Sequence, residues 1–335
     1  MKKILMMLSA LSAVISSVSG QHPHSGHQHN FGAPISIMGD HVHLEGEWMV
    51  SYRYMTMLMD GMGTGSNSLS SQSVYDKGYM VTPTEMKMDM HMLSLMYAPT
   101  ENLTIMGMVG YILKEMEHET KARSMMRMKL GETFTRESEG LGDVSVLVLY
   151  KVWQSGSQSL HFNAGVSLPT GGIDEEHAGF LPYPMQLGSG TFDLIPGFTY
   201  NGSEGKLSWG GQLLGTVHLS DNDADYALGD ALNVNGWGAY QFIDSIAGSI
   251  RLSYLRKDEI DGNDARITTI MNPAQDSRNN GGEWLDLGVG LSITPKVFFH
   301  GSRIAVEYAF PLTQDLNGVQ MKSDHAMTVG WQLAW

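Results

Sequence analysis

From Glu45 to Trp335 the chain alternates apolar and polar residues in segments of roughly ten residues, and turn-forming residues separate the segments. Successive side chains of a β-strand point to opposite faces, so each segment predicts a strand with one apolar and one polar face. The polar face repeatedly carries charge, as at Asp286 and Glu307, which suits a wet lumen better than a packed core. The predicted fold class is therefore all-β: a transmembrane antiparallel β-barrel of the bacterial outer-membrane type.

About twelve strands are predicted, an even number as in bacterial single-chain barrels. They are placed at 45–58, 86–98, 102–116, 142–153, 159–169, 190–201, 206–219, 230–243, 246–256, 283–294, 302–312 and 324–335. The connections alternate in length, beginning with a long one at 59–85 and a short "PTE", and the alternation continues along most of the chain. This parity predicts short turns and both termini on the periplasmic side, with long loops outside.

The final segment, "AMTVGWQLAW", places apolar or aromatic residues on one face and small or polar residues on the other. Trp331 and Trp335 fall on the apolar face, where they are predicted to join the aromatic girdle at the membrane interface. This ending resembles the C-terminal assembly signal of outer-membrane proteins. The resemblance implies the barrel-assembly machinery as a partner, beside outer-membrane lipid.

The first twenty residues, "MKKILMMLSALSAVISSVSG", predict a secretory signal peptide, because two lysines precede an apolar run that ends in small residues. Residues 21–44 form a polar, histidine-rich segment that is expected in the periplasm, with insertion into the barrel mouth as an alternative. No later apolar run reaches the ~20 residues that a membrane helix needs. The predicted domains are therefore signal peptide 1–20, N-terminal segment 21–44 and barrel 45–335.

Composition narrows the possible functions. The sequence contains no cysteine, which excludes disulfide bonds and thiolate chemistry. Its formal net charge of −14 argues against nucleic acid as a partner, because phosphate contacts need clustered lysine and arginine, and it attracts cations instead. Neither a Gly-x-Ser-x-Gly nor a His-Glu-x-x-His motif occurs, and no enzymatic activity is predicted.

Methionine is concentrated in one part of the chain. Seventeen of the 25 methionines lie between Met49 and Met128, and the stretch "MKMDMHM" (86–92) has one at every second position. Because Leu93, Leu95 and Tyr97 make the better lipid face of that strand, the methionine row is predicted to face the lumen. The other predicted lumen-lining residues are Met49, Arg53, Met55, Met57, Met96, Met106, Met108, Asp193, Asp286 and Glu307.

Three interpretations of the methionine row are open. Methionine fills irregular space or contacts lipid, its thioether binds Cu(I) or Ag(I), and its reversible oxidation makes an oxidant sink. The histidine-rich segment favours the metal interpretation, because short histidine-rich tracts are typical of metal binding. The candidate metal ligands are His22, His24, His27, His29, His41, His43, Met86, Met88, Met90 and Met92. No cofactor is obligatory in this interpretation, and copper ions are the candidate.

Two stretches, "SLPTGG" (167–172) and "PYPMQLGSGTFDLIPGFTY" (182–200), resemble the family of meta-pathway phenol-degradation proteins, often called transporters. Members of this family resemble small relatives of the long-chain fatty-acid channels. The resemblance implies an outer-membrane barrel that passes a small solute. Within the second stretch Pro196 removes a donor from the strand ladder, which predicts a bulge or kink there.

Two functions follow from these patterns. The first is a barrel that transports or binds soft metal ions, copper or silver, through a methionine relay of low affinity. The second is a channel for small apolar or aromatic molecules, for which methionine supplies a pliable apolar wall. A structural or adhesive barrel and an outer-membrane lipase are further alternatives with less support in the sequence.

Overall fold

The computed structural model describes residues 32–121, 131–267, 270–295 and 301–335. The predicted signal peptide and the candidate ligands His22, His24, His27 and His29 lie outside the described residues. The longer strands are β1 (Trp48–Gly65), β3 (Val81–Thr100), β4 (Leu103–Thr120), β5 (Thr133–Leu141), β6 (Val144–Ser155), β7 (Gln158–Leu168), β8 (Asp193–Glu204), β9 (Leu207–His218), β11 (Ala231–Ile243), β12 (Ile246–Lys257), β14 (Gly282–Ile293) and β15 (Ser302–Ala334).

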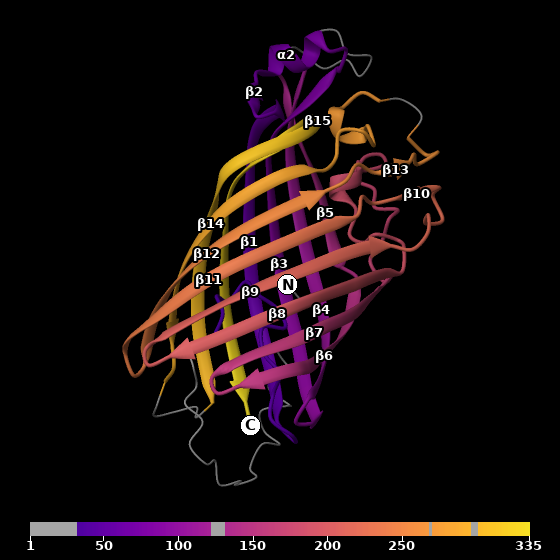
Figure 1. Ribbon diagram of the computed structural model, residues 1–335. Helices are drawn as coiled ribbons and strands as arrows, with labels where there is room; N and C mark the ends of the chain where they lie inside the picture. Colours follow the sequence, from indigo (N-terminus) through magenta and orange to yellow (C-terminus); the bar gives the residue numbers. More distant parts are fainter. Residues whose placement is uncertain (1–31, 122–130, 268–269, 296–300) are drawn as a thin grey trace.

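Eleven of these strands close into one antiparallel barrel. The hydrogen-bonded order is β15-β14-β12-β11-β9-β8-β7-β6-β4-β3-β1, and β1 pairs with β15 to complete the ring (Figure 1). The barrel fold class predicted from the alternating segments is confirmed. Closure gives every strand of the ring a hydrogen-bonded neighbour on both sides, so the wall has no open sheet edge in lipid.

The last strand, β15, serves as two wall segments. Its first part, Ile304–Leu316, pairs with β14, and its second part, Leu316–Ala334, pairs with β1. Gly318 has a positive φ of 61° between the two parts, and the amide of Ala334 donates to the carbonyl of Gly301 at 3.1 Å, so the strand folds back on itself. Twelve wall segments therefore result, as predicted, but no loop occupies 313–323.

Other strand ends also differ from the prediction. β1, β3 and β4 contain 18, 20 and 18 residues, so they run well past the roughly ten residues needed to cross a bilayer. The reason lies in the sequence, since alternation continues through "MTMLMDGMGTG" beyond Leu58. β5 occupies part of the connection predicted at 117–141 and pairs with the outer half of β4. Short elements β2 (Asn67–Leu69) and α2 (Ser71–Asp76) occupy part of the connection predicted at 59–85.

The alternation of connection lengths is also seen in the structure. Short connections lie at the end of the barrel that holds the C-terminus, here called the turn end, and long ones lie at the opposite loop end (Figure 1). Pro196 causes no bulge: the β8–β9 register is the same before and after it, at Leu194↔Val217 and Gly197↔Leu214, and only the pairing of two residues is missing. The proline therefore interrupts the ladder without shifting it.

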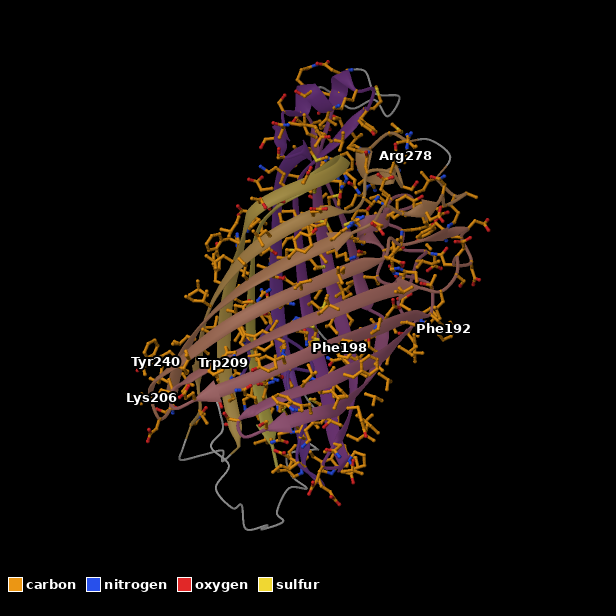
Figure 2. All side chains as sticks on the ribbon, viewed as in Figure 1. Phe192, Phe198, Lys206, Trp209, Tyr240 and Arg278 are labelled. Carbon is orange, nitrogen blue, oxygen red and sulfur yellow. The ribbon has the colours of Figure 1, made fainter. Side chains whose placement is uncertain are left out.

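The outer surface of the wall is apolar. Exposed side chains that alternate with buried polar ones include Leu95, Val146, Leu213, Ile250 and Val289. Aromatic side chains flank this belt, and Figure 2 shows Tyr240 near the turn end, next to Lys206, with Arg278 at the loop end. Trp335 exchanges backbone hydrogen bonds with Trp48, whose ring stacks on Tyr97 at 4.3 Å. An apolar belt of this kind is matched to lipid, whereas a soluble barrel would expose polar groups.

The N-terminal segment enters the lumen. Residues 33–43, here called the insert, present backbone carbonyls to lumen-facing side chains of the wall. Arg53 donates to the carbonyl of Ile35 at 2.8 Å, and His161 bonds the carbonyl of Gly39 at 2.9 Å. A Cβ atom on Gly330 would lie 2.5 Å from the Ile35 side chain, so only glycine permits this approach. The described part of segment 21–44 thus occupies the barrel mouth, which was the alternative raised from the sequence.

No helix in the described ranges is long and apolar enough to cross a membrane.

Candidate functional site

Methionines from three neighbouring strands line one side of the lumen. β1 and β3 pair so that Met57 is opposite Met88 and Met55 is opposite Met90. Toward the loop end Met59, Met86 and Met116 are in register across β1, β3 and β4, and toward the turn end Met49, Met96 and Met106 are in register likewise. Eleven thioethers form a continuous strip along the lumen, here called the methionine ladder. Its members are Met49, Met55, Met57, Met59, Met86, Met88, Met90, Met92, Met96, Met106 and Met116.

The burial pattern shows which way the ladder faces. Met86 and Met96 are 3% and 2% exposed, whereas Leu95 on the opposite face of β3 is 44% exposed. Met88, Met90 and Met92 are half-buried, and a Cβ on Gly110 would touch Met90 and Met92 within the lumen. The structure therefore places the even positions of "MKMDMHM" inside, with Met55, Met57 and Met108 also half-buried.

The predicted polar lumen residues occupy two levels. Arg53 and Glu307 are almost fully buried near the insert, and Ser36 of the insert donates to Glu307. Asp193 lies nearer the loop end, where it accepts hydrogen bonds from Ser189 and Thr191. Asp286 is half-buried, on the lumen face of β14.

A cavity of about 480 Å³ lies at the loop end of the lumen. One wall consists of the loop-end part of the methionine ladder together with Met62 of β1 and Met321 of β15. The other walls come from Trp284 and from the loops that follow β7 and β12. Small-molecule sites commonly have this volume and this combination of an apolar wall with few polar groups.

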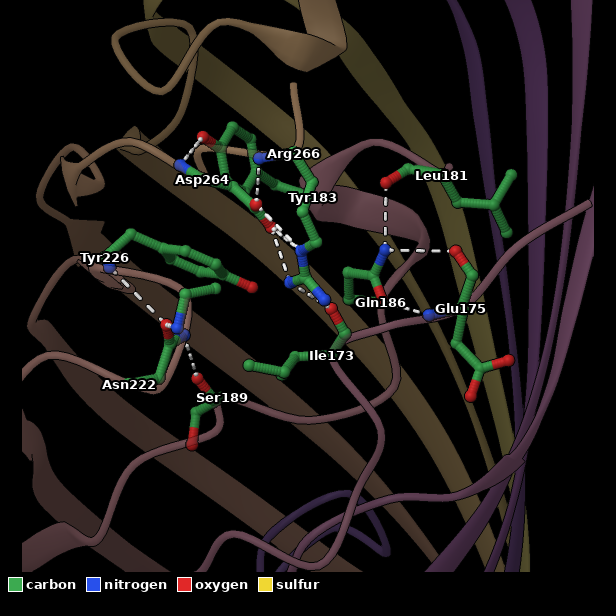
Figure 3. A network of polar contacts seen from close by, with 11 residues as sticks. Ile173, Glu175, Leu181, Tyr183, Gln186, Ser189, Asn222, Tyr226, Asp264 and Arg266 are labelled. Carbon is green, nitrogen blue, oxygen red and sulfur yellow. Dashed lines mark hydrogen bonds and ion pairs between the residues drawn. The ribbon is translucent and has the colours of Figure 1, made fainter. Parts of the chain in front are cut away.

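Polar contacts join loops from three connections at the loop end into one network, here called the cover (Figure 3), and its members Tyr183, Gln186 and Ser189 line the cavity. Arg266 donates to both carboxylate oxygens of Asp264 and to the carbonyl of Ile173, which joins the β12–β14 loop to the β7–β8 loop. The hydroxyl of Tyr183 accepts from the Asp264 amide at 3.0 Å. Burial of Tyr226 behind these groups raises its pKa to about 12. The cover is therefore held together by polar contacts between the loops, and Asp264 and Tyr226 are buried in it.

Four ionisable residues that the sequence analysis did not single out also line the cavity: Lys114, Asp143, His218 and Lys257. Asp143 accepts from the amides of Gly171 and Ser189 at 2.8 Å each, so its charge holds the β7–β8 loop. Lys114 could have been found from the alternation of β4, because it belongs to the same even-numbered, inward-facing series as Met106, Met108 and Met116. Lys257 is the last residue of its strand, where parity carries little signal.

The described residues do not assemble a metal site of the familiar type. Within the described ranges, no three His, Cys, Asp or Glu side chains come together as metal ligands. His41 and His43 lie near the turn end with ring centroids 4.6 Å apart, far along the lumen from Met86. Each faces a carboxylate, Asp40 at 3.0 Å and Glu47 at 3.3 Å. His41 and His43 are therefore in a different region of the lumen from the predicted methionine ligands Met86, Met88, Met90 and Met92.

Asp40 and His41 shift each other's pKa. The Asp40 carboxylate raises the pKa of the His41 imidazole above its usual 6.5, although burial acts in the opposite direction. Burial by itself would raise the pKa of Asp40, but His41 and two arginines outweigh it and hold that pKa well below 3.8. The pair lies within the insert, and Arg53 and Arg303 of the wall also act on the Asp40 carboxylate.

A closed antiparallel wall, an apolar belt and a polar lumen with a loop-covered cavity define a transmembrane β-barrel of the bacterial outer-membrane type. Residues 76–308 match the family described as "Putative MetA-pathway of phenol degradation", and the chain belongs to that family. This confirms the resemblance found in the sequence.

The fold is shared by a solved structure. The COG4313 outer membrane channel from Pseudomonas putida F1 has a TM-score of 0.61 at 14% identity, and the match covers 89% of this chain and 98% of that one. A FadL homologue from Pseudomonas aeruginosa matches at a TM-score of 0.39 and 9% identity, over 87% of this chain and 89% of that one. No curated protein matches the sequence.

Proposed function

We propose that the protein is an outer-membrane channel that admits small, largely apolar molecules through the loop-end cavity and along the methionine ladder. The observation that carries this proposal is the continuity of the ladder, which joins the cavity to the turn-end half of the lumen. Thioether side chains are flexible and polarisable, so a wall built from them adapts to solutes of different shape. The COG4313 structure, described as an outer membrane channel, is consistent with this function.

In this proposal the loop end faces the exterior and the turn end, with both termini, faces the periplasm. Long loops on the exterior and short turns on the periplasmic side are the rule for bacterial barrels, which supports the assignment. A solute entering from outside would therefore meet the Asp264–Arg266 cover first and the insert last. Passage requires that both the cover and the insert move, and no catalytic step is involved.

The proposal is tested by uptake into cells with an intact outer membrane. Cells expressing the protein are expected to take up a small aromatic probe, such as phenol, several-fold faster than cells with an empty vector. Met86→Trp fills the cavity with a bulkier side chain and should abolish the gain. Leu95→Trp is the matched control, because Leu95 is on the same strand but faces outward. Equal uptake by the two variants would contradict the proposal.

A second candidate function is the handling of Cu(I) or Ag(I). The specific observation in its favour is the cross-strand pairing of thioethers, Met55 with Met90 and Met57 with Met88, because directly opposed residues have Cβ atoms about 4.5–5.5 Å apart. Two or three thioethers at such spacing suit a soft, low-coordinate ion. Sites of this kind along a path would bind weakly enough to release the ion.

A further inference from the structure

Two lysines extend into the loop-end cavity from opposite sides of the barrel. Lys114 is on β4 and Lys257 is at the end of β12, and in the strand order five strands separate β4 from β12 on one side and four on the other. Both line the cavity and both are half-buried.

Neither lysine has a carboxylate partner among the described residues. Lys114 donates to two backbone carbonyls, those of Pro184 at 2.8 Å and Gln186 at 2.5 Å, which leaves one of its three donors unused. For Lys257, no hydrogen bond or ion pair of the ammonium group occurs within the described part of the chain. Two like charges that face one cavity without counter-charges repel each other unless an anion joins them.

The carboxylates of the cavity are engaged elsewhere. Asp143 is bound to amides of the β7–β8 loop, and Asp193 accepts from Ser189 and Thr191, with His218 3.8 Å away. They hold the loop against the wall rather than neutralise the lysines. The cavity therefore contains two ammonium groups without a carboxylate partner: Lys114 beside Met116 in the methionine wall and Lys257 on the other side.

We infer that the cavity binds a small organic anion, whose carboxylate lies between Lys114 and Lys257 and whose apolar body packs on Met86 and Met116. A charge-assisted hydrogen bond from each ammonium group fixes the head of the ligand, and the thioethers accept bodies of varied shape. A bare metal cation is disfavoured at this position by the same two charges. The inference rests on the proposed channel function and narrows its substrate class to aromatic or short aliphatic carboxylates.

The test compares benzoate with benzamide, a neutral molecule of nearly the same shape, by titration calorimetry on the purified full chain in non-ionic detergent. Benzoate is expected to bind at least about tenfold more tightly than benzamide. Lys257→Met should weaken benzoate binding about tenfold or more and leave benzamide binding unchanged, while Lys257→Arg should retain it. Lys206→Met is the matched control, because Lys206 is at the turn end (Figure 2).

Equal binding of benzoate and benzamide, or unchanged benzoate binding by Lys257→Met, would overturn the inference. If Lys257→Met does not give a folded, heat-modifiable barrel on a gel, Lys114→Met makes the same comparison from the other wall. The outcome is separable from that of the uptake assay. A protein that speeds phenol uptake but does not discriminate between benzoate and benzamide retains the channel function and loses the anion site.

Discussion

Arg251 and Glu307 form an ion pair over β14, the strand that lies between theirs in the wall, with 2.6 Å between Nη2 and Oε1. Glu307 is 2% exposed, and the hydroxyl of Ser36 is 2.9 Å from both of its carboxylate oxygens. One buried carboxylate therefore connects β12, β15 and the insert. This connection explains how a segment without secondary structure keeps a defined position inside the barrel.

Removal of that carboxylate should destabilise the protein. Glu307→Ala leaves the Arg251 guanidinium without its ion-pair partner and with only the Asn235 amide oxygen as an acceptor. Breaking a buried pair typically costs about 3–5 kcal/mol. Glu307→Gln keeps hydrogen bonds to both neighbours and should cost less. The free energy of unfolding, measured with guanidinium in micelles, checks both values. A loss for Glu307→Ala below that for Glu307→Gln would contradict the role of the pair.

The Asp40–His41 pair should make the anchoring of the insert dependent on pH. The raised pKa of His41 means that its contribution is complete below 6.5 and is lost as the pH rises through the raised value. The lowered pKa of Asp40 means that its contribution is present above 3.8 and is lost as the pH falls. The pair therefore acts between these limits.

Asp40→Asn removes the largest cause that raises the pKa of His41, so that pKa should fall below that of the wild-type protein. Titration of the His41 imidazole by NMR measures the change, with His41→Gln to assign the signal. Asp324→Asn is the control variant, because the Asp324 carboxylate pairs with His325 and not with His41. An unchanged His41 titration would show that Asp40 is not its partner.

Much of this architecture follows from the sequence, because the side-chain period of a strand is two and lipid selects the outward face. The inward direction of Met86–Met92 and the alternation of turns and loops depend only on that period. Insertion of the N-terminal segment into the barrel was raised only as an alternative. Its contacts were not predictable, since backbone carbonyls of residues such as Ile35 and Gly39 make them and carry no side-chain signal. Lys114 and Lys257 are 143 residues apart in number, and only closure of the barrel brings them together.

The cover of the cavity should loosen when Arg266 is removed. Arg266→Ala leaves Asp264, whose side chain is 2% exposed, without its ion-pair partner, and disconnects the β12–β14 loop from Ile173. Proteinase K should then cleave within 258–281 several-fold faster. Arg278→Ala is the control, because the Arg278 side chain is 78% exposed in a surface pair with Asp276, and such pairs contribute little. Equal cleavage of the two variants would exclude a role for Arg266 in closing the cover.

Replacement of four ladder methionines separates the two candidate functions. Met→Leu at positions 55, 57, 88 and 90 conserves volume and apolar character, so the barrel should stay folded and phenol uptake should change by less than about twofold. Ag(I) binding, measured by anaerobic titration, should disappear if the ladder handles soft metals. Leucine at four methionines of the chain outside the ladder gives the control. Ag(I) binding that survives in the ladder variant would rule out the metal function of the ladder.

The most direct test of the central claim is a blocking experiment at the loop-end cavity. The sequence has no cysteine, so Met59→Cys places a single thiol in the cavity wall, and Leu95→Cys places one on the outer face. Single-channel current is recorded in planar bilayers before and after a bulky thiosulfonate reagent is added on the loop side. The account predicts that the reagent blocks the current through Met59→Cys and leaves that through Leu95→Cys unchanged. A current through Met59→Cys that persists after complete modification would contradict a solute path along the methionine ladder.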